Sequence, residues 1–132
     1  MAKSIRPEEL SIEIAAALAE YEDDVAEALK AECKQVAKET TQELRRTSPQ
    51  KTGEYAQGWK SKTEYESRED IRIIVYNGKK PQLSHLLEFG HVCRNGTQRV
   101  FGRVTGHAHI TVAETHAAEK LDARIKVRLR TV

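Results

Sequence analysis

Apolar residues recur at spacings of three and four along the first third of the chain. They are Ile14, Leu18, Tyr21, Val25, Leu29, Val36 and Leu44. This spacing lines one face of an α-helix, and Pro49 ends the segment because proline disfavours helical geometry at the preceding residue. The pattern predicts a long helix over residues 8–47, and residues 14–44 carry the apolar stripe. This length is unusual in a chain of 132 residues, so the helix either breaks near Ser11 or packs partly on another chain.

An alternating pattern follows the helix. Residues 58–65 alternate along the chain, and residues 71–76 are rich in β-branched and aromatic side chains. The stretch between them, 66–70, is turn-like, so the two segments predict an antiparallel hairpin. Asn77-Gly78 ends the second strand and favours a turn with positive φ. Thr52-Gly53 permits a sharp turn from the long helix into the sheet.

The second half of the chain contains two further helical patterns. Leu83–Phe89 reads as a short helix capped by Gly90, and the polar, glycine-containing stretch 91–106 reads as a mobile loop. A second helix is predicted from Ile110 to about Arg128, on an apolar face of Ile110, Ala113, Ala117, Leu121 and Ile125. Because residues 125–130 alternate, a terminal strand remains an alternative.

These elements predict one α+β domain over residues 1–132: a long N-terminal helix, a small antiparallel β-sheet, a short central helix and a C-terminal helix. The sheet core spans 48–114, and the basic segment 115–132 is the C-terminal helix or strand. Hydrophobic residues make up only 39% of the chain. The core is therefore shallow, and self-association would add stability.

Charge is divided unevenly along the chain. Residues 1–44 hold eleven acidic and five basic residues, whereas residues 45–132 hold nine acidic and seventeen basic residues. Oppositely charged ends allow head-to-tail contacts between copies, although such runs more often form solvated faces. We expect no signal peptide, and the sequence contains no run of about 20 apolar residues. Cys33 and Cys93 lie in no motif, so we expect free thiols in a reducing cytoplasm.

The histidines are the first candidates for chemistry. His91-x-Cys93 and His107-x-His109 offer ligands that suit zinc, but their one-residue spacing is unusual and neighbouring arginines disfavour a cation. We therefore expect surface or interface histidines, with no metal or cofactor. Glu88 lies near His85 and His91, yet no catalytic motif accompanies the set, so we expect no enzyme activity.

Nucleic-acid binding is the stronger rival. Lys79-Lys80, the arginines of 91–106 and the tail from Lys120 to Arg130 could contact phosphate. Against this, the net charge is only +2, and the aromatic residues do not interleave with the basic ones. Basic residues also suit a protein that lines a channel for DNA. A basic DNA-binding accessory protein of a prophage therefore remains the alternative.

Five short strings, taken in order, resemble a known family. They are Ser48-Pro49-Gln50-Lys51-Thr52-Gly53, then Tyr55 to Trp59, Val75-Tyr76-Asn77, His85-Leu86-Leu87-Glu88-Phe89-Gly90-His91 with Arg94-Asn95-Gly96, and Gly106-His107-Ala108-His109-Ile110 with Ala113-Glu114. This order resembles the minor tail or tail-completion proteins of long-tailed phages (siphophages), also called head–tail joining proteins. The resemblance runs from about Ser48 to Glu114. His109 and Val112 depart from it, standing where prolines or a phenylalanine are common, so we expect a looser join between loop and helix.

The resemblance implies a structural protein of the virion, made in the bacterial cytoplasm and located at the head–tail junction. Its implied partners are copies of itself in a ring, six-fold as tails are, and the neighbouring head–tail connector or tail-tube proteins. Phage DNA would pass through the ring, and no membrane is involved. The candidate interface residues are Glu88, His91, Arg94, Arg99 and Arg103, and we expect Glu88 and His91 at the exposed end of the short helix. We expect the arginines to meet an acidic surface of a neighbour, such as the helix face bearing Glu20, Glu22, Asp23, Asp24 and Glu27.

Overall fold

The computed structural model describes residues 9–15, 17–49, 53–94 and 100–130. The elements follow in the order β1 (Leu10–Ile14), the 3-10 turn η1 (Ala17–Glu20), α1 (Asp23–Thr47), α2 (Glu54–Gln57), β2 (Trp59–Glu66), β3 (Ile71–Asn77), α3 (Pro81–Phe89), β4 (Gly90–Arg94), β5 (Val100–Thr105) and α4 (Ile110–Arg130). The predicted α+β class is confirmed. The C-terminal segment is a helix, so the alternative of a terminal strand is wrong.

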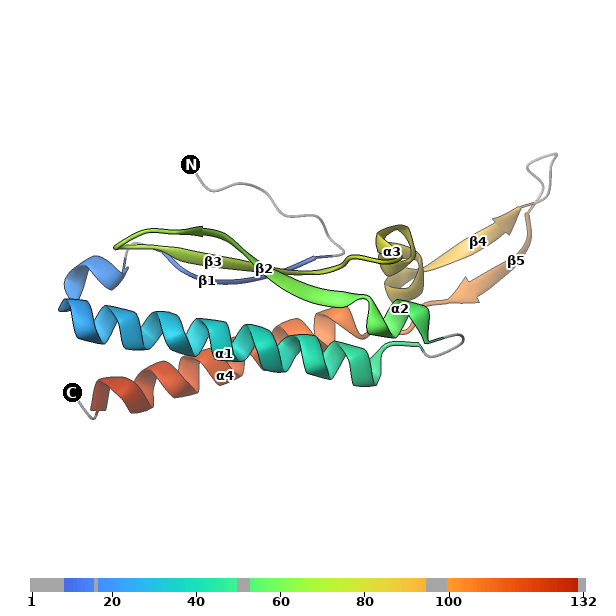
Figure 1. The fold of residues 1–132 in the computed structure, drawn as a ribbon. Helices are drawn as coiled ribbons and strands as arrows, with labels where there is room; N and C mark the ends of the chain where they lie inside the picture. The colour runs from blue at the N-terminus through green and yellow to red at the C-terminus, as the bar shows by residue number, and fades with distance from the viewer. Residues whose placement is uncertain (1–8, 16, 50–52, 95–99, 131–132) are drawn as a thin grey trace.

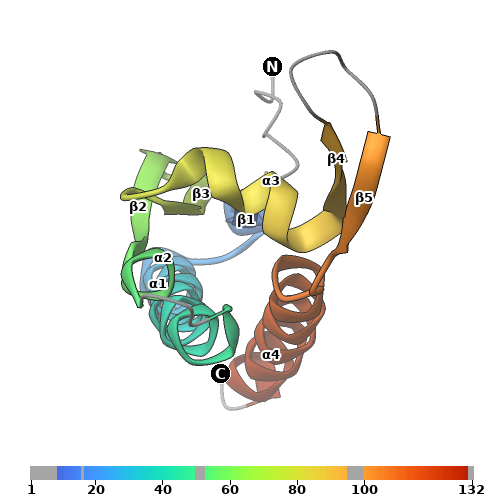
Figure 2. The ribbon, with the colours of Figure 1, turned by 90° about the vertical axis from the view of Figure 1, so that its right-hand side faces the viewer.

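One antiparallel sheet lies over a pair of helices (Figures 1 and 2). Its strand order is β1-β3-β2, so β3 is central. Ile71, Ile73 and Val75 of β3 are buried in the same core cluster as residues of α1 and α4. The hairpin predicted from the alternating segments is therefore confirmed as β2 and β3, which pair from Trp59↔Asn77 to Glu66↔Ile71.

The prediction that the long helix begins near residue 8 is wrong. Residues 10–14 form a strand on β3, in the register Leu10↔Val75 to Ile14↔Ile71, and α1 begins only at Asp23. The strand is favoured because apolar and polar residues alternate here, so that pairing buries Leu10 and Ile12 on the core side. The predicted end of the helix before Pro49 is confirmed, since α1 ends at Thr47.

The segment predicted as a mobile loop contains a second sheet. β4 and β5 pair antiparallel, from Gly90↔Thr105 to Arg94↔Val100. This hairpin projects beyond α3, at the end of the body opposite the start of α1 (Figure 1), and Figure 2 shows it standing apart from the β1-β3-β2 sheet. The loop prediction was wrong because it relied on the polar composition of the whole segment. The two strands are short, and they form because their backbone groups hydrogen-bond to each other.

Two glycines have the backbone geometry that the turns require. Gly53 (φ 82°) is the N-cap of α2, and Gly90 (φ 81°) caps α3 by donating its backbone N–H to the carbonyl of Leu86. Both agree with the sequence. The positive φ expected at Asn77-Gly78 is wrong, because among the described glycines only Gly53 and Gly90 have positive φ. Instead, the Asn77 side chain accepts hydrogen bonds from the backbone N–H groups of Lys79 and Lys80.

The helix pair is held together by ion pairs between the acidic residues of α1 and the basic residues of α4. Arg124 makes a two-pronged contact with Glu39 at 2.6 and 2.7 Å, and Arg128 lies 3.1 Å from Glu32. The hydrogen bonds from Arg124 lower the pKa of Glu39 to about 2. The two helices run antiparallel, side by side (Figure 1). Acidic residues from the first third of the chain are therefore paired with basic residues from its last part, within the same molecule.

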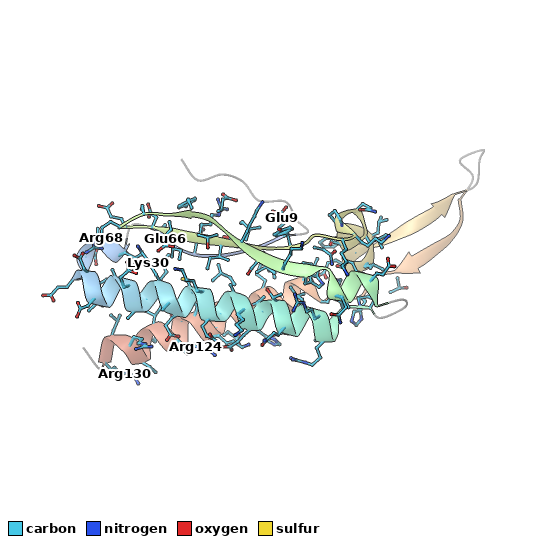
Figure 3. All side chains as sticks on the ribbon, in the orientation of Figure 1. Glu9, Lys30, Glu66, Arg68, Arg124 and Arg130 are labelled. Carbon is cyan, nitrogen blue, oxygen red and sulfur yellow. The ribbon has the colours of Figure 1, made fainter. Side chains whose placement is uncertain are left out.

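A buried lysine joins α1 to the edge of the sheet. Lys30 is almost fully buried, and its Nζ lies 3.4 Å from Glu27 and 3.6 Å from Glu66 of β2. Figure 3 shows Lys30 of α1 beneath Glu66. An acidic partner on each side compensates the buried charge, which would otherwise be costly.

Leu29→Ala tests the packing of α1. Leu29 is 2% exposed in the core cluster, so its truncation should lower the free energy of unfolding by about 2–4 kcal/mol. Urea denaturation followed by circular dichroism measures this loss. The matched control is Leu86→Ala, at a side chain that is 37% exposed, where we expect a loss of about 1 kcal/mol or less. Equal losses at the two sites would contradict the packing described.

Candidate assembly site

The base of the projecting hairpin is fixed by the carboxylate of Glu88. Glu88 lies near the end of α3 and is 5% exposed. Its oxygens accept hydrogen bonds from the backbone N–H groups of His109 (2.7 Å), Ile110 (2.7 Å) and Thr111 (3.0 Å), and from the Thr111 hydroxyl (2.7 Å). The first turn of a helix leaves such N–H groups without intrahelical partners. Glu88 therefore caps α4 from another element and joins α3 to α4.

Gly106 allows the chain to pass close to this cap. A Cβ at Gly106 would lie 2.5 Å from the carbonyl oxygen of Glu88 and 2.6 Å from the carbonyl carbon of Phe89. Backbone atoms cannot move aside as a flexible side chain can, so only glycine fits at this position. The next residue, His107, donates its backbone N–H to the carbonyl of Leu87, which holds the exit of the hairpin against α3.

A buried network beside the cap connects α2 to α4. Nδ1 of His109 lies 2.6 Å from the carbonyl oxygen of His107, so Nδ1 carries the proton. Nε2 is then an acceptor, and the Tyr55 hydroxyl donates to it over 2.7 Å. Burial lowers the pKa of His109 and raises the pKa of Tyr55 to about 12. His109 is therefore neutral at pH 7, and its 3.0 Å contact with Glu88 is not an ion pair at that pH.

The network predicts a loss of stability in acid. Burial raises the pKa of Glu88, but the hydrogen bonds it accepts outweigh burial and lower the pKa overall. His109, with its lowered pKa, contributes stability that is present above its ordinary value of 6.5 and is lost as the pH falls below it. Glu88 adds a second loss below its ordinary value of 4.5. Thermal denaturation between pH 8 and pH 3 should show a melting temperature that falls first below pH 6.5. In His109→Gln the first fall should disappear, and an unchanged profile would contradict this assignment.

The candidate interface residues occupy different environments. Glu88 was expected at an exposed position, and that is wrong because its carboxylate is buried and bonded within the chain. His91 and Arg94 lie on β4, where His91 pairs with Val104 of β5, and Arg103 lies on β5 opposite Val92. Arg99 lies outside the described residues. The hairpin thus brings His91, Arg94 and Arg103 onto one projection, and their role in assembly stays a prediction.

The sequence did not reveal the cap or the network. A looser join was expected at His109 and Val112, but His109 is 1% exposed and bonded on both ring nitrogens. Glu88 and Thr111 are the residues from which the cap could have been predicted. Carboxylates and hydroxyl groups are typical of helix N-termini, and Thr111 lies at the start of the predicted C-terminal helix. The contact could not be inferred from spacing, since 23 residues separate the two in the chain.

The described part of the chain holds neither a cluster of metal ligands nor a membrane-spanning helix. Among the described residues, no three histidine, cysteine, aspartate or glutamate side chains converge on a common point that could hold a metal ion. The side chains of His91 and Cys93 lie outside that description, so the expected lack of zinc stays a prediction. No helix of the described chain combines the length and apolar character needed to cross a bilayer.

Comparison with known proteins identifies the family. Residues 12–90 match the model of the HK97-gp10-like family, described as "Bacteriophage HK97-gp10, putative tail-component". The match covers more than half of the chain and runs from the middle of β1 to the end of α3. No curated protein and no solved structure matches the chain significantly. The chain belongs to the HK97-gp10-like family of bacteriophage tail components.

Proposed function

We propose that this phage tail component is a structural subunit of the head–tail junction and assembles as a ring that joins or completes the tail. The observation that carries the proposal is the family match over residues 12–90. The shape of the chain supports it, because a firmly packed body bears a projecting hairpin whose base is fixed by Glu88. The partners would be further copies, six-fold in number, and the adjacent connector or tail-tube proteins, with phage DNA passing through the ring.

The proposal includes no enzymatic step. Tyr55, His109 and Glu88 resemble an acid–base relay in their contacts, but the side chains of His109 and Glu88 are 0% and 2% exposed. Both ring nitrogens of His109 and the oxygens of Glu88 are occupied within the chain. A group in general acid–base catalysis must reach a substrate proton, and this network is enclosed. Its contacts support a structural role.

The alternative is a basic DNA-binding accessory protein, and one observation favours it. A depression of about 240 Å³ between α1 and β2 is lined by Lys38, Arg45 and Lys60 together with neutral polar residues. Against it, Lys120, Arg124 and Arg128 of the basic tail are ion-paired with acidic residues of α1. A cation that is already paired releases fewer counterions from DNA. The junction protein is therefore the better-supported function.

A phage in which the gene is inactivated tests the proposal. We expect lysates that contain DNA-filled heads and separate tails, and restoration of joined particles when the wild-type chain is supplied in trans. Electron microscopy and plaque counts measure both. Joined, infectious particles without the chain would contradict the proposal. If the purified chain bound duplex DNA with a steep salt dependence and the mutant phage joined normally, the DNA-binding alternative would be favoured.

A further inference from the structure

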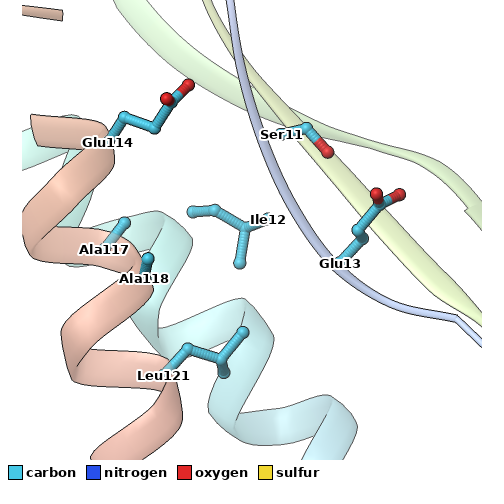
Figure 4. A pocket seen from close by; sticks show the side chains of 7 residues that line it. All are labelled: Ser11, Ile12, Glu13, Glu114, Ala117, Ala118 and Leu121. Carbon is cyan, nitrogen blue, oxygen red and sulfur yellow. The ribbon is translucent and has the colours of Figure 1, made fainter. Parts of the chain in front are cut away.

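A groove between β1 and α4 remains open on the side of the body away from β2. It has a volume of about 160 Å³. Its floor is apolar, formed by Ile12 of β1 and by Ala117, Ala118 and Leu121 of α4. Figure 4 shows Ile12 pointing from the strand toward these three residues. The small alanine side chains leave room above the helix, so the groove can accept side chains from outside.

The rim of the groove is acidic. Glu13 and Glu114 line it, and none of the described lysine or arginine residues does. Glu114 is exposed, and Glu13 is 39% exposed although it lies 3.3 Å from Arg72. An apolar floor with carboxylates at its edge fits a segment that combines apolar side chains with a cation.

Two other depressions do not have this combination. The hollow at the start of α1 is lined by Glu22, Asp23, Asp24 and Arg68, and no apolar side chain of the described chain lines it. The hollow between α1 and β2 is lined by three basic and three neutral polar residues. The acidic face at 20–27, expected from the sequence to receive a neighbour, lies around the first of these, whose described lining provides no apolar floor.

The strand that borders the groove is at the edge of its sheet. Within the described residues β1 pairs with β3 alone, so its other side presents backbone donors and acceptors. An open strand edge is a template for pairing with another strand. β1 has five residues, and β4 and β5 have five and six. The lengths match, and among the described elements the hairpin extends away from the body of its own chain (Figure 1).

The sequence of the hairpin has the composition that the groove requires. Its strands carry Val92, Val100, Phe101 and Val104 together with Arg94 and Arg103. We propose that the β4–β5 hairpin of one copy lies along β1 of a second copy, with apolar side chains in the β1–α4 groove and arginines at its acidic rim. This contact is head-to-tail, and such a contact closes into a ring when the rotation between copies permits. The inference rests on the proposed function, because it names the surface through which the ring would form.

Cross-linking through the natural thiol of the hairpin tests the contact. Of the two cysteines in the chain, Cys33 is fully buried, and burial raises its thiol pKa to about 12, so it should not react. Cys93 lies on β4. We expect Ala118→Cys, in the groove, to give cross-linked chains with a short bis-maleimide, in the purified protein and in phage particles. The products should be lost in Ala118→Cys/Cys93→Ser.

The controls place the new thiol on the two competing surfaces. Lys38→Cys lies in the basic hollow and Asp24→Cys in the acidic hollow of α1, and neither should cross-link efficiently. The proposal is overturned if either control links as well as Ala118→Cys. It is also overturned if Cys93 and the thiol introduced at Ala118 link within a single chain, which mass spectrometry would show. If Ala118→Cys gives no cross-links in particles that contain the chain, the proposed contact is likewise overturned. The proposed junction function is not affected by that result, because complementation of the inactivated phage measures it separately.

A charge exchange tests the rim. Glu114→Arg and Arg103→Glu should each raise the dissociation constant of self-association about tenfold or more, because each brings like charges together. The combined variant should recover most of the loss. Glu119→Arg, an exposed change on the same helix outside the groove lining, is the matched control and should have little effect. Failure of the combined variant to recover, or an equal loss in Glu119→Arg, would contradict the pairing.

Discussion

Glu88→Ala should destabilise the protein more than any surface substitution. The change removes the acceptor for three backbone N–H groups and one hydroxyl at the start of α4. Buried donors without a partner are costly, and we expect the free energy of unfolding to fall by about 3–5 kcal/mol. Because the cap joins α3 to α4, helix signal and cooperativity should both decrease. Urea denaturation of the purified chain at pH 7 measures the effect.

Two further variants test whether the loss of stability comes from the Glu88 carboxylate itself. Glu88→Gln keeps the shape and one acceptor oxygen but loses the charge, so its loss should be intermediate. Glu119→Ala removes an exposed carboxylate from α4 and should change stability by about 0.5 kcal/mol or less. If Glu88→Ala were as stable as Glu119→Ala, Glu88 would not be the cap of α4.

Reversal of the hairpin arginines should abolish virion assembly without unfolding the chain. In Arg94→Glu/Arg99→Glu/Arg103→Glu, the hairpin would present acidic residues to an acidic neighbour. The body should remain folded, because its core is built from apolar residues such as Leu29, Ile73 and Val75, whereas the three exchanged positions lie in the chain segment that runs from β4 to β5. We expect particles without joined tails and no complementation of the inactivated phage. Higher salt should weaken self-association of the wild type in the same direction, since exposed charges are screened over about 8–10 Å.

A variant with the same change in net charge elsewhere is the control. Arg46→Glu/Lys79→Glu/Arg130→Glu alters three exposed positions of the body and should complement at least in part. If the hairpin variant complements as well as wild type, the hairpin is only a connection between α3 and α4. If both variants fail, net charge and not the hairpin is responsible.

The sequence predicted the elements whose signals are local. Pro49 marked the end of α1, the β-branched residues of 71–76 marked the central strand, and Gly90 marked the end of α3. The apolar face from Ile110 to Ile125 predicted α4, although alternation near the end left a strand as an alternative. In each case the residues that decide the conformation lie within a few positions of the element. The sequence of each such segment is therefore enough to predict its secondary structure.

The elements that the sequence missed depend on distant partners. β1 alternates over only five residues, and its assignment as a strand required β3, which lies far along the chain in the register Leu10↔Val75. The β4–β5 hairpin was hidden because its average composition is polar. Glu88 was assigned to the surface because a charged residue near a helix end usually lies there. Only the folded chain brings the first turn of α4 to its carboxylate.

The central claim is that this family member forms a ring at the head–tail junction. High-resolution electron microscopy of intact virions from the phage that encodes it tests this most directly. We expect a closed ring of this chain between the connector and the tail tube, with β4 and β5 of each copy against β1 and α4 of the next. Density for the chain elsewhere in the tail, or virions that lack the chain altogether, would contradict the account.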